Sequence, residues 1–86
     1  MPDALPNSAD IRQALLTHCG LSPEELTEDS PLFSSGLLDS FYLIELLGRI
    51  EEMSGLKVGM GEVSLENFDT PRRIADFLAR KRAGGP

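Results

Sequence analysis

Two amphipathic segments, each followed by a glycine, most constrain the fold of this chain. Apolar residues recur at helical spacing over about residues 9–19, with Ser8 as the expected N-cap and Gly20 where a left-handed residue closes a helix. A second segment, about residues 40–53, ends in the same way at Gly55. We therefore predict two long helices with defined ends.

A third main helix is expected to begin at Asp69-Thr70-Pro71, where a capping side chain precedes a proline at the first helical position. Its apolar stripe consists of Ile74, Phe77 and Leu78. Its last turn holds the cations that the helix dipole favours, Arg80, Lys81 and Arg82. Before this helix, Ser64 is placed to cap one short helical turn that runs to Phe68.

The rest of the chain lacks the pattern of a half-buried strand, and Leu56-Lys57-Val58 is too short to form one. We predict an all-α fold, a small four-helix bundle of three main helices and one short helix, with a long loop between the first two helices. That loop runs from Leu21 to Asp39, and structureless loops longer than about 12–15 residues are usually functional. A short helical turn is expected over residues 22–26. The apolar residues expected to tie the loop to the bundle are Leu26, Leu32, Phe33, Leu37 and Leu38.

Length and cysteine content exclude several classes of protein. A chain of 86 residues forms one small domain, expected over residues 8–82 between a flexible lead-in, 1–7, and a flexible tail, 83–86. Such a chain buries only about 60% of its unfolded surface, so we do not expect a deep active site or a self-sufficient enzyme. Cys19 and His18 are single, which excludes a disulfide or a Cys/His zinc site within one chain. We interpret Cys19 as a small buried hydrophobe and His18 as favouring the helix dipole.

The charge of the chain is acidic and unevenly placed. The formal net charge is −6, but residues 20–69 hold eleven acidic and two basic residues, a net of −9, while the stretch from Thr70 onward is basic. This balance opposes binding to nucleic acid or to anionic membrane surfaces, which requires clustered Lys and Arg. The sequence also lacks a membrane-spanning apolar run and a secretory signal, so we expect a cytoplasmic protein.

The second helix is predicted to have two different faces. At 100° per residue, its core face consists of Leu43, Leu46, Leu47, Ile50 and Met53. Phe41 and Ile44 fall on the other side, beside Glu45, Gly48 and Glu52. Either the loop or the short helix covers these two apolar side chains, or they form a docking surface for transient partners. Their position next to acids at the helix start favours docking.

Ser40 opens this helix, and a serine there is most often an N-cap. A role as a catalytic nucleophile has no support, because the sole histidine lies in the first helix and no base is indicated. A helix N-terminus does stabilise a phosphate ester, since free N–H groups and the positive end of the dipole meet the anion there. Ser40 is therefore well placed to carry a phosphate-linked group, and we assign no catalytic or metal-ligating residue.

The stretch from Leu32 to Phe41, Leu-Phe-Ser-Ser-Gly-Leu-Leu-Asp-Ser-Phe, resembles the attachment-site region of acyl and peptidyl carrier proteins, whose pattern is Gly-x-x-Asp-Ser-(Leu or Met). The order of helices also agrees, so the resemblance covers about residues 8–81. It implies that a separate phosphopantetheinyl transferase esterifies Ser40 with 4′-phosphopantetheine, and that Asp39 helps to hold the metal ion of that reaction. The thiol of this arm would bear a cargo as a thioester.

The resemblance also implies partners and a surface that they contact. The positions that match the family's partner contacts are Leu37, Phe41, Ile44, Glu45 and Gly48. The expected partners are the transferase, a cargo-loading ligase or acyltransferase, and a downstream synthase or transferase. The chain itself would be a monomeric carrier and not an enzyme.

Three residues depart from the pattern of fatty-acid carriers. Phe41 replaces the usual Leu or Met, and Tyr42 and Arg49 make the second helix less acidic. The sequence looks more like free-standing carriers of the D-alanyl type, which serve cell-wall modification, and like stand-alone carriers of secondary metabolism that load amino acids or unusual short acyl units. Two alternatives stay open: an unmodified helical protein-interaction module, and a domain excised from a larger synthase. The initiating Met1 and the loose ends favour a free-standing chain, and resemblance of fold does not fix the cargo.

Overall fold

The computed structural model describes residues 5–84, except for the side chains of His18, Cys19, Ser40 and Met60. Its helices are α1 (Ser8–Cys19), α2 (Ser40–Ser54), α3 (Leu65–Phe68) and α4 (Pro71–Arg82), joined by two 3₁₀ turns, η1 (Pro23–Glu25) and η2 (Met60–Glu62). No strand occurs within the described residues. The predicted all-α fold of three main helices and one short helix is confirmed. The expectations for residues 1–4 and 85–86, and for the side chains of His18 and Cys19, lie outside the described part.

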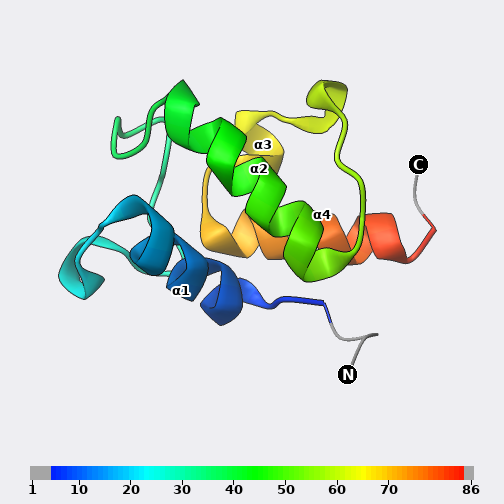
Figure 1. The fold of residues 1–86 in the computed structure, drawn as a ribbon, viewed down its shortest axis with the longest axis horizontal. Coiled ribbons are helices and arrows are strands. Elements are labelled where there is room, and N and C mark those ends of the chain that lie inside the picture. The colour runs from blue at the N-terminus through cyan, green and yellow to red at the C-terminus, as the bar shows by residue number, and fades with distance from the viewer. Residues whose placement is uncertain (1–4, 85–86) are drawn as a thin grey trace.

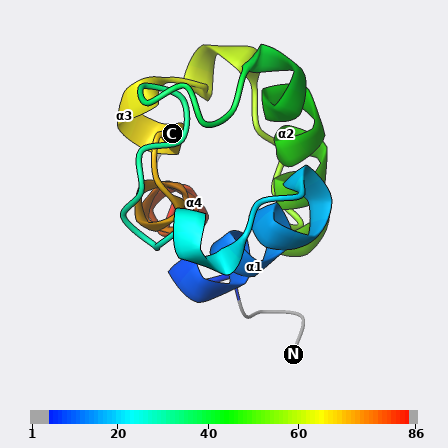
Figure 2. The ribbon, with the colours of Figure 1, turned by 90° about the vertical axis from the view of Figure 1, so that its left-hand side faces the viewer.

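The helices surround one core, and the long loop closes one end of it. α1 packs against α4 and α2, and α3 packs against α4. α2 crosses in front of α4 in Figure 1, with α1 below it. Figure 2 looks onto the end of the bundle where the loop between α1 and α2 passes α4 and α3 before it reaches the start of α2. The loop therefore links the beginning of α2 to the far side of the bundle.

Every main helix contributes to the core, and so does the loop. The fully or nearly fully buried apolar residues are Ile11, Leu15, Leu26, Leu32, Leu38, Leu46, Leu47, Ile50, Phe68, Ile74, Phe77 and Leu78. Three of them, Leu26, Leu32 and Leu38, belong to the loop, while Phe33 and Leu37 are half-buried against the same core. Burying each large apolar side chain favours folding by about 1.5–3 kcal/mol. The prediction that these five residues tie the loop down is confirmed.

The N-cap of α1 is Asn7, not the predicted Ser8. The Asn7 Oδ1 accepts a hydrogen bond from the backbone N–H of Asp10 at 2.9 Å, and the Asp10 carboxylate accepts one from the Asn7 N–H at 3.0 Å. This reciprocal pair satisfies two N–H groups at once, which a serine at position 8 alone does not do. The Ser8 hydroxyl instead donates to the Glu28 carboxylate in the loop. At the C-terminus of α1, Gly20 has the predicted left-handed conformation, with φ of 69°.

The start of α4 and the short α3 follow the sequence prediction closely. The Thr70 hydroxyl accepts a hydrogen bond from the Arg73 N–H at 3.0 Å, and Pro71 occupies the first helical position. The Ser64 hydroxyl oxygen accepts one from the Asn67 N–H at 3.3 Å and so caps α3. No helix within residues 5–84 combines the length and the apolar character that crossing a membrane requires.

Candidate functional site

α2 begins at Ser40, and the residue before it provides the cap. The Oδ1 atom of Asp39 accepts hydrogen bonds from the backbone N–H groups of Phe41, at 3.0 Å, and Tyr42, at 3.4 Å. The simplest interpretation of Ser40, that it is the N-cap, is therefore wrong. Asp39 is the N-cap instead, because a carboxylate at this position interacts with both the free N–H groups and the positive end of the helix dipole. Ser40 is the first residue of the helix, directly after its N-cap.

The turn before Asp39 sets where α2 starts. The Gly36 N–H donates to the Phe33 carbonyl at 3.1 Å, and Gly36 has φ of 82°, a conformation that a residue with a Cβ rarely adopts. The Leu38 N–H then donates back to the Leu32 carbonyl at 2.8 Å. Leu32 and Leu38 are both buried in the core. Residues 32–38 thus form a closed turn, named here the loop turn, whose two ends are fixed side by side.

Asp69, between α3 and α4, binds the loop turn. Its Oδ1 accepts from the backbone N–H groups of Phe33, at 2.9 Å, and Ser34, at 3.0 Å, and its Oδ2 accepts from the Ser34 hydroxyl at 2.7 Å. Its carbonyl oxygen accepts from the Leu32 N–H at 2.6 Å. Burial by itself raises the pKa of the Asp69 carboxyl, but the hydrogen bonds from Ser34 and Phe33 outweigh it and hold that pKa below its ordinary value. The sequence indicated only that Asp69 lies at a helix start.

An apolar groove opens beside the start of α2. Its volume is about 390 Å³. It lies between the loop turn, the first turns of α2 and α3, and its lining residues are Phe33, Leu38, Asp39, Leu43, Val63, Ser64, Leu65 and Phe68. A group esterified to Ser40 would begin next to this groove, because Asp39 is the neighbouring residue. The sequence did not predict this groove, since its two walls lie about 25 residues apart in the chain.

The surface of α2 that faces away from the core is named here the outer face; it consists of Phe41, Ile44, Glu45 and Gly48. Phe41 is 67% exposed and Ile44 61% exposed, so the alternative that the loop or α3 covers them is wrong. The rings of Phe41 and Tyr42 meet edge to face with centroids 5.7 Å apart. Four of the five residues of the predicted core face are confirmed, because Leu46, Leu47 and Ile50 are buried and Leu43 packs against them. Met53 is the exception, since it is only half-buried and lines a groove between α2 and α1.

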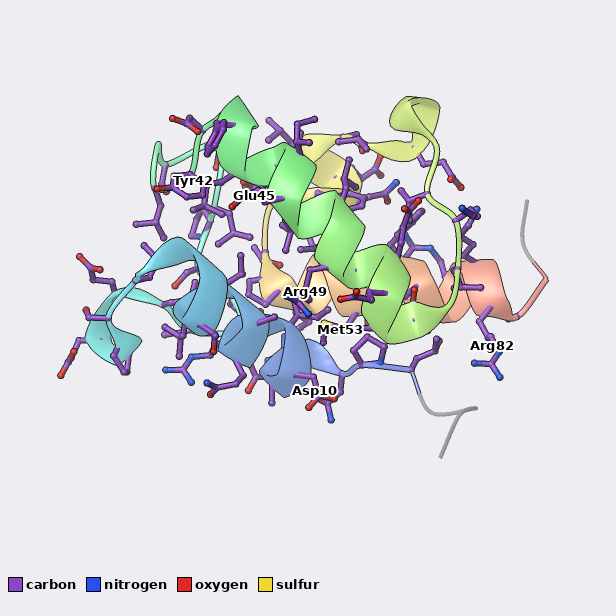
Figure 3. The ribbon with its side chains drawn as sticks, in the orientation of Figure 1. Asp10, Tyr42, Glu45, Arg49, Met53 and Arg82 are labelled. Carbon is purple, nitrogen blue, oxygen red and sulfur yellow. The ribbon has the colours of Figure 1, made fainter. Side chains whose placement is uncertain are left out.

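A hollow on the outer face surrounds Gly48. It has a volume of about 420 Å³ and is lined by Ile44, Glu45, Gly48, Arg49 and Glu52. A Cβ at Gly48 would meet nothing within 4 Å. Arg49 donates to Glu52 at 2.8 Å and also lines a groove between α2 and α1; Figure 3 shows it on α2 between Glu45 and Met53. The structure therefore brings Ile44, Glu45 and Gly48 together around one hollow, which Leu37 does not line.

The acidic charge of the chain is partly neutralised within the fold. Arg72 binds Asp29 at 2.7 Å and lies 3.6 Å from Glu28, and Lys81 binds Glu62 at 2.8 Å. The hydrogen bond from Arg72 lowers the pKa of Asp29, and the one from Lys81 lowers the pKa of Glu62. Within the described part of the chain, Glu45 makes no ion pair or side-chain hydrogen bond. These ion pairs therefore involve acidic residues outside α2, while Glu45 on the outer face has no ion-pair partner among the described residues.

Comparison with known proteins identifies the family. A model of the phosphopantetheine attachment site matches residues 9–78. The chain is 38% identical over 68 residues to a D-alanyl carrier protein of Abiotrophia defectiva, covering 70% of this chain and 86% of that protein. It is 37% identical over 62 residues to a D-alanyl carrier protein of Bacillus pumilus, covering 69% of this chain and 80% of that one.

A further relative is much longer. Over 56 residues, 65% of this chain, it is 54% identical to the lincomycin biosynthesis protein LmbN of Streptomyces lincolnensis, of which the match covers 20%. The attachment domain implies a covalent 4′-phosphopantetheine group and a carrier role rather than catalysis. A helix N-terminus beside an apolar groove fits a group with a phosphate at one end and a flexible chain at the other. The chain thus belongs to the phosphopantetheine-binding family of carrier proteins.

Proposed function

We propose that Ser40 is the residue that carries 4′-phosphopantetheine. The observation that supports this most is its place as the first residue of α2, directly after the capping carboxylate of Asp39. The match to the attachment-site family includes this position. A phosphate ester at a helix start meets backbone N–H groups and the positive end of the dipole. When bound, the group supplies a thiol that carries cargo as a thioester.

The modification needs an activated phosphate donor, and coenzyme A supplies it. The Ser40 oxygen forms a bond to the phosphorus next to pantetheine, the diphosphate bond breaks, and adenosine 3′,5′-bisphosphate leaves; a base of the transferase takes the hydroxyl proton. Asp39 uses Oδ1 for its cap, while Oδ2 accepts no hydrogen bond from the described residues and is available to a Mg²⁺ ion. Among the described residues, no group of three or more His, Cys, Asp and Glu side chains could hold a metal ion. We propose that the transferase and its substrate provide the other ligands of the ion.

We propose an amino acid or a short acyl unit as the cargo. The D-alanyl carrier relatives support an aminoacyl cargo, and the similarity to LmbN supports a setting in secondary metabolism. A loading ligase and a downstream transferase or synthase would contact the outer face of α2 together with Leu37. A partner side chain that enters the hollow around Gly48 would contact Ile44 through apolar atoms and Glu45 through a basic group. We further propose that the carrier is monomeric and acts in the cytoplasm.

Intact mass tests the attachment. The purified protein is incubated with coenzyme A, Mg²⁺ and a broad-specificity phosphopantetheinyl transferase, and we expect a gain equal to one phosphopantetheine. Ser40→Ala should abolish the gain, while Ser35→Ala, which removes the nearest other serine, should retain it. No gain in the wild type, or a gain that survives Ser40→Ala, contradicts the assignment and favours an unmodified interaction module.

A second measurement tests the cargo. The modified protein is offered D-alanine, ATP and the loading ligase of a D-alanyl system, and we expect a mass gain of one alanyl residue that hydroxylamine removes. Loading with L-amino acids by adenylating enzymes of secondary metabolism is compared in parallel. Loading only in the second reaction would contradict a D-alanyl role and support the second candidate.

A further inference from the structure

A buried carboxylate outside the attachment site has all its hydrogen bonds directed at the loop turn. Asp69 is 7% exposed, and burying a charge is costly unless it is fully hydrogen-bonded. Its carboxylate receives three hydrogen bonds, all from Phe33 and Ser34, which are 36 and 35 residues away in the chain. The bonds therefore join the start of α4 to a distant segment rather than capping a helix locally.

The loop turn connects these bonds to the start of α2. Phe33 and Ser34 lie at one end of the turn, and the bond from the Leu38 N–H to the Leu32 carbonyl, at 2.8 Å, ties the other end to it. Leu38 is 3% exposed, so it has little freedom to shift. The next two residues are the cap Asp39 and Ser40. Because the turn is closed, a shift of Ser34 would also shift the first residue of α2.

The segment before the loop turn is held to α4 by a different residue. The Arg72 N–H donates to the Glu28 carbonyl at 2.9 Å, and its guanidinium binds Asp29 at 2.7 Å. These two side chains are 53% and 67% exposed, so solvent weakens their ion pair. The hydrogen bonds of Asp69 are part-buried and charge-assisted, and Asp69 itself is nearly inaccessible to solvent, which makes them the stronger attachment.

We propose that Asp69 is a positioning residue for the modification of Ser40: its carboxylate holds the loop turn so that the start of α2 is presented to the transferase. This inference rests on the proposed function of Ser40. It assigns to Asp69 no contact with coenzyme A or with the reacting atoms. The outer face of α2, where the transferase is expected to dock, does not depend on Asp69.

The kcat and KM of the modification, measured separately, distinguish a positioning role of Asp69 from a role in stability alone. When a variant is only less stable, its unfolded fraction lowers the concentration of competent substrate, so the apparent KM rises while kcat is unchanged. When the folded variant binds normally but presents Ser40 out of place, kcat falls while KM is unchanged. Small misplacements of a reacting group cost about ten- to a hundredfold in rate.

The experiment varies the concentration of the carrier against a fixed amount of transferase with saturating coenzyme A and Mg²⁺. We expect Asp69→Ala to lower kcat about ten- to a hundredfold with little change in KM. Asp69→Asn keeps an oxygen acceptor without the charge, so it should restore part of the rate. Asp76→Asn, the same change at an exposed position of α4, is the matched control and should match the wild type.

Hydrogen exchange provides the structural readout. In Asp69→Ala the amides of Phe33 and Ser34, which both donate to Oδ1, should lose protection while those in the middle of α2 retain it. Asp69→Asn keeps one oxygen acceptor and is the variant to use if Asp69→Ala does not fold, and there the loss of protection should be partial. Four outcomes would each overturn the proposal. The first two are a raised KM with normal kcat in the Asp69 variants, and kinetics that do not change. The other two are an equal fall of kcat in Asp76→Asn, and a lower kcat in the Asp69 variants with full protection of both amides. Failure of the proposed function is distinct, because the wild type itself would then gain no mass or gain it without Ser40.

Discussion

Two regions of the molecule differ in how far their side chains find partners within the fold. They are the outer face of α2 and the contact between Asp69 and the loop turn. On the outer face, Phe41 and Ile44 are 67% and 61% exposed, and Gly48 leaves a hollow of about 420 Å³. At Asp69, a buried carboxylate accepts every hydrogen bond that two neighbouring residues can direct to it. The outer face leaves apolar surface exposed for another molecule, whereas at the Asp69 contact every hydrogen-bond donor of Phe33 and Ser34 has its acceptor.

This difference indicates that the two regions near Ser40 have different roles. A carrier has to be recognised by several enzymes in turn, and an open surface suits transient contacts. Ser40, the proposed attachment residue, has in contrast to be offered in one arrangement. Because the outer face and the Asp69 contact share no residue, substitutions in one should leave the other intact. The following predictions test this separation in order of decreasing effect on stability.

The largest effect is expected on the core side of α2, opposite the outer face. Leu46 is 4% exposed, and Leu46→Ala removes packing that nothing nearby replaces. We expect a loss of about 2–5 kcal/mol in the free energy of unfolding, measured by urea denaturation. A loss below about 1 kcal/mol would contradict the assignment of the two faces.

Acidification should weaken the contact between Asp69 and the loop turn. The pKa of Asp69 in the fold lies below its ordinary value of 3.8, so its contribution to stability is present above the unfolded pKa and is lost as the pH falls through the folded pKa. Between about pH 5 and pH 2.5, the wild type should lose more stability than Asp69→Asn. The other carboxylates titrate in both proteins, so thermal melts of equal pH dependence would contradict this assignment.

Filling the hollow should stabilise the protein and impair docking. Gly48 lies in the middle of α2 with open space around it, so Gly48→Ala removes the low helix propensity of glycine without a clash. We expect a gain of up to about 1 kcal/mol in the free energy of unfolding. A slower loading reaction of the stabilised variant would show that the hollow itself receives a partner side chain; a loss of stability would contradict the description of the hollow.

The smallest effect on stability is expected for Ile44→Arg. Its side chain already lies in water, so the free energy of unfolding should change by no more than about 0.5 kcal/mol. Loading by a partner ligase should slow at least fivefold, because apolar anchors at the centre of an interface contribute more than about 1 kcal/mol. Circular dichroism and loading rates measured on one preparation check both parts, and unfolding of the variant would refute the outer-face assignment of Ile44.

Much of the fold was predictable because its determinants are local. The glycines at 20 and 55 end α1 and α2 in the left-handed conformation, with φ of 69° and 72°, as predicted. Thr70 caps α4, and the spacing of apolar residues in α2 separates its buried and exposed sides correctly. Each of these features depends on residues within two turns of one another, where spacing alone carries the information.

The prediction of Ser8 as an N-cap is wrong, and so is the simplest interpretation of Ser40 as one. Ser8 and Ser40 follow Asn7 and Asp39, which are equally good capping residues, so composition did not decide between neighbours. The contact of Asp69 with Ser34 was not predictable, because no pattern within a short window relates residues 35 positions apart. The groove beside Ser40 escaped prediction for the same reason. The motif indicates Ser40 as the proposed attachment residue, while long-range contacts hold the turn that precedes it.

The separation of Asp69 from Phe33 along the chain also bears on the order of folding. Closing a loop of 36 residues costs more conformational entropy than forming a helical turn, so such contacts form late. The loop turn then reaches its final arrangement only after the start of α4 has docked. A nascent chain that has been synthesised only as far as α3 already contains Ser40, the proposed attachment residue, but not the Asp69 carboxylate that binds the loop turn. We expect modification to follow completion of the fold, so that an arm bearing a reactive thiol is attached to finished carriers.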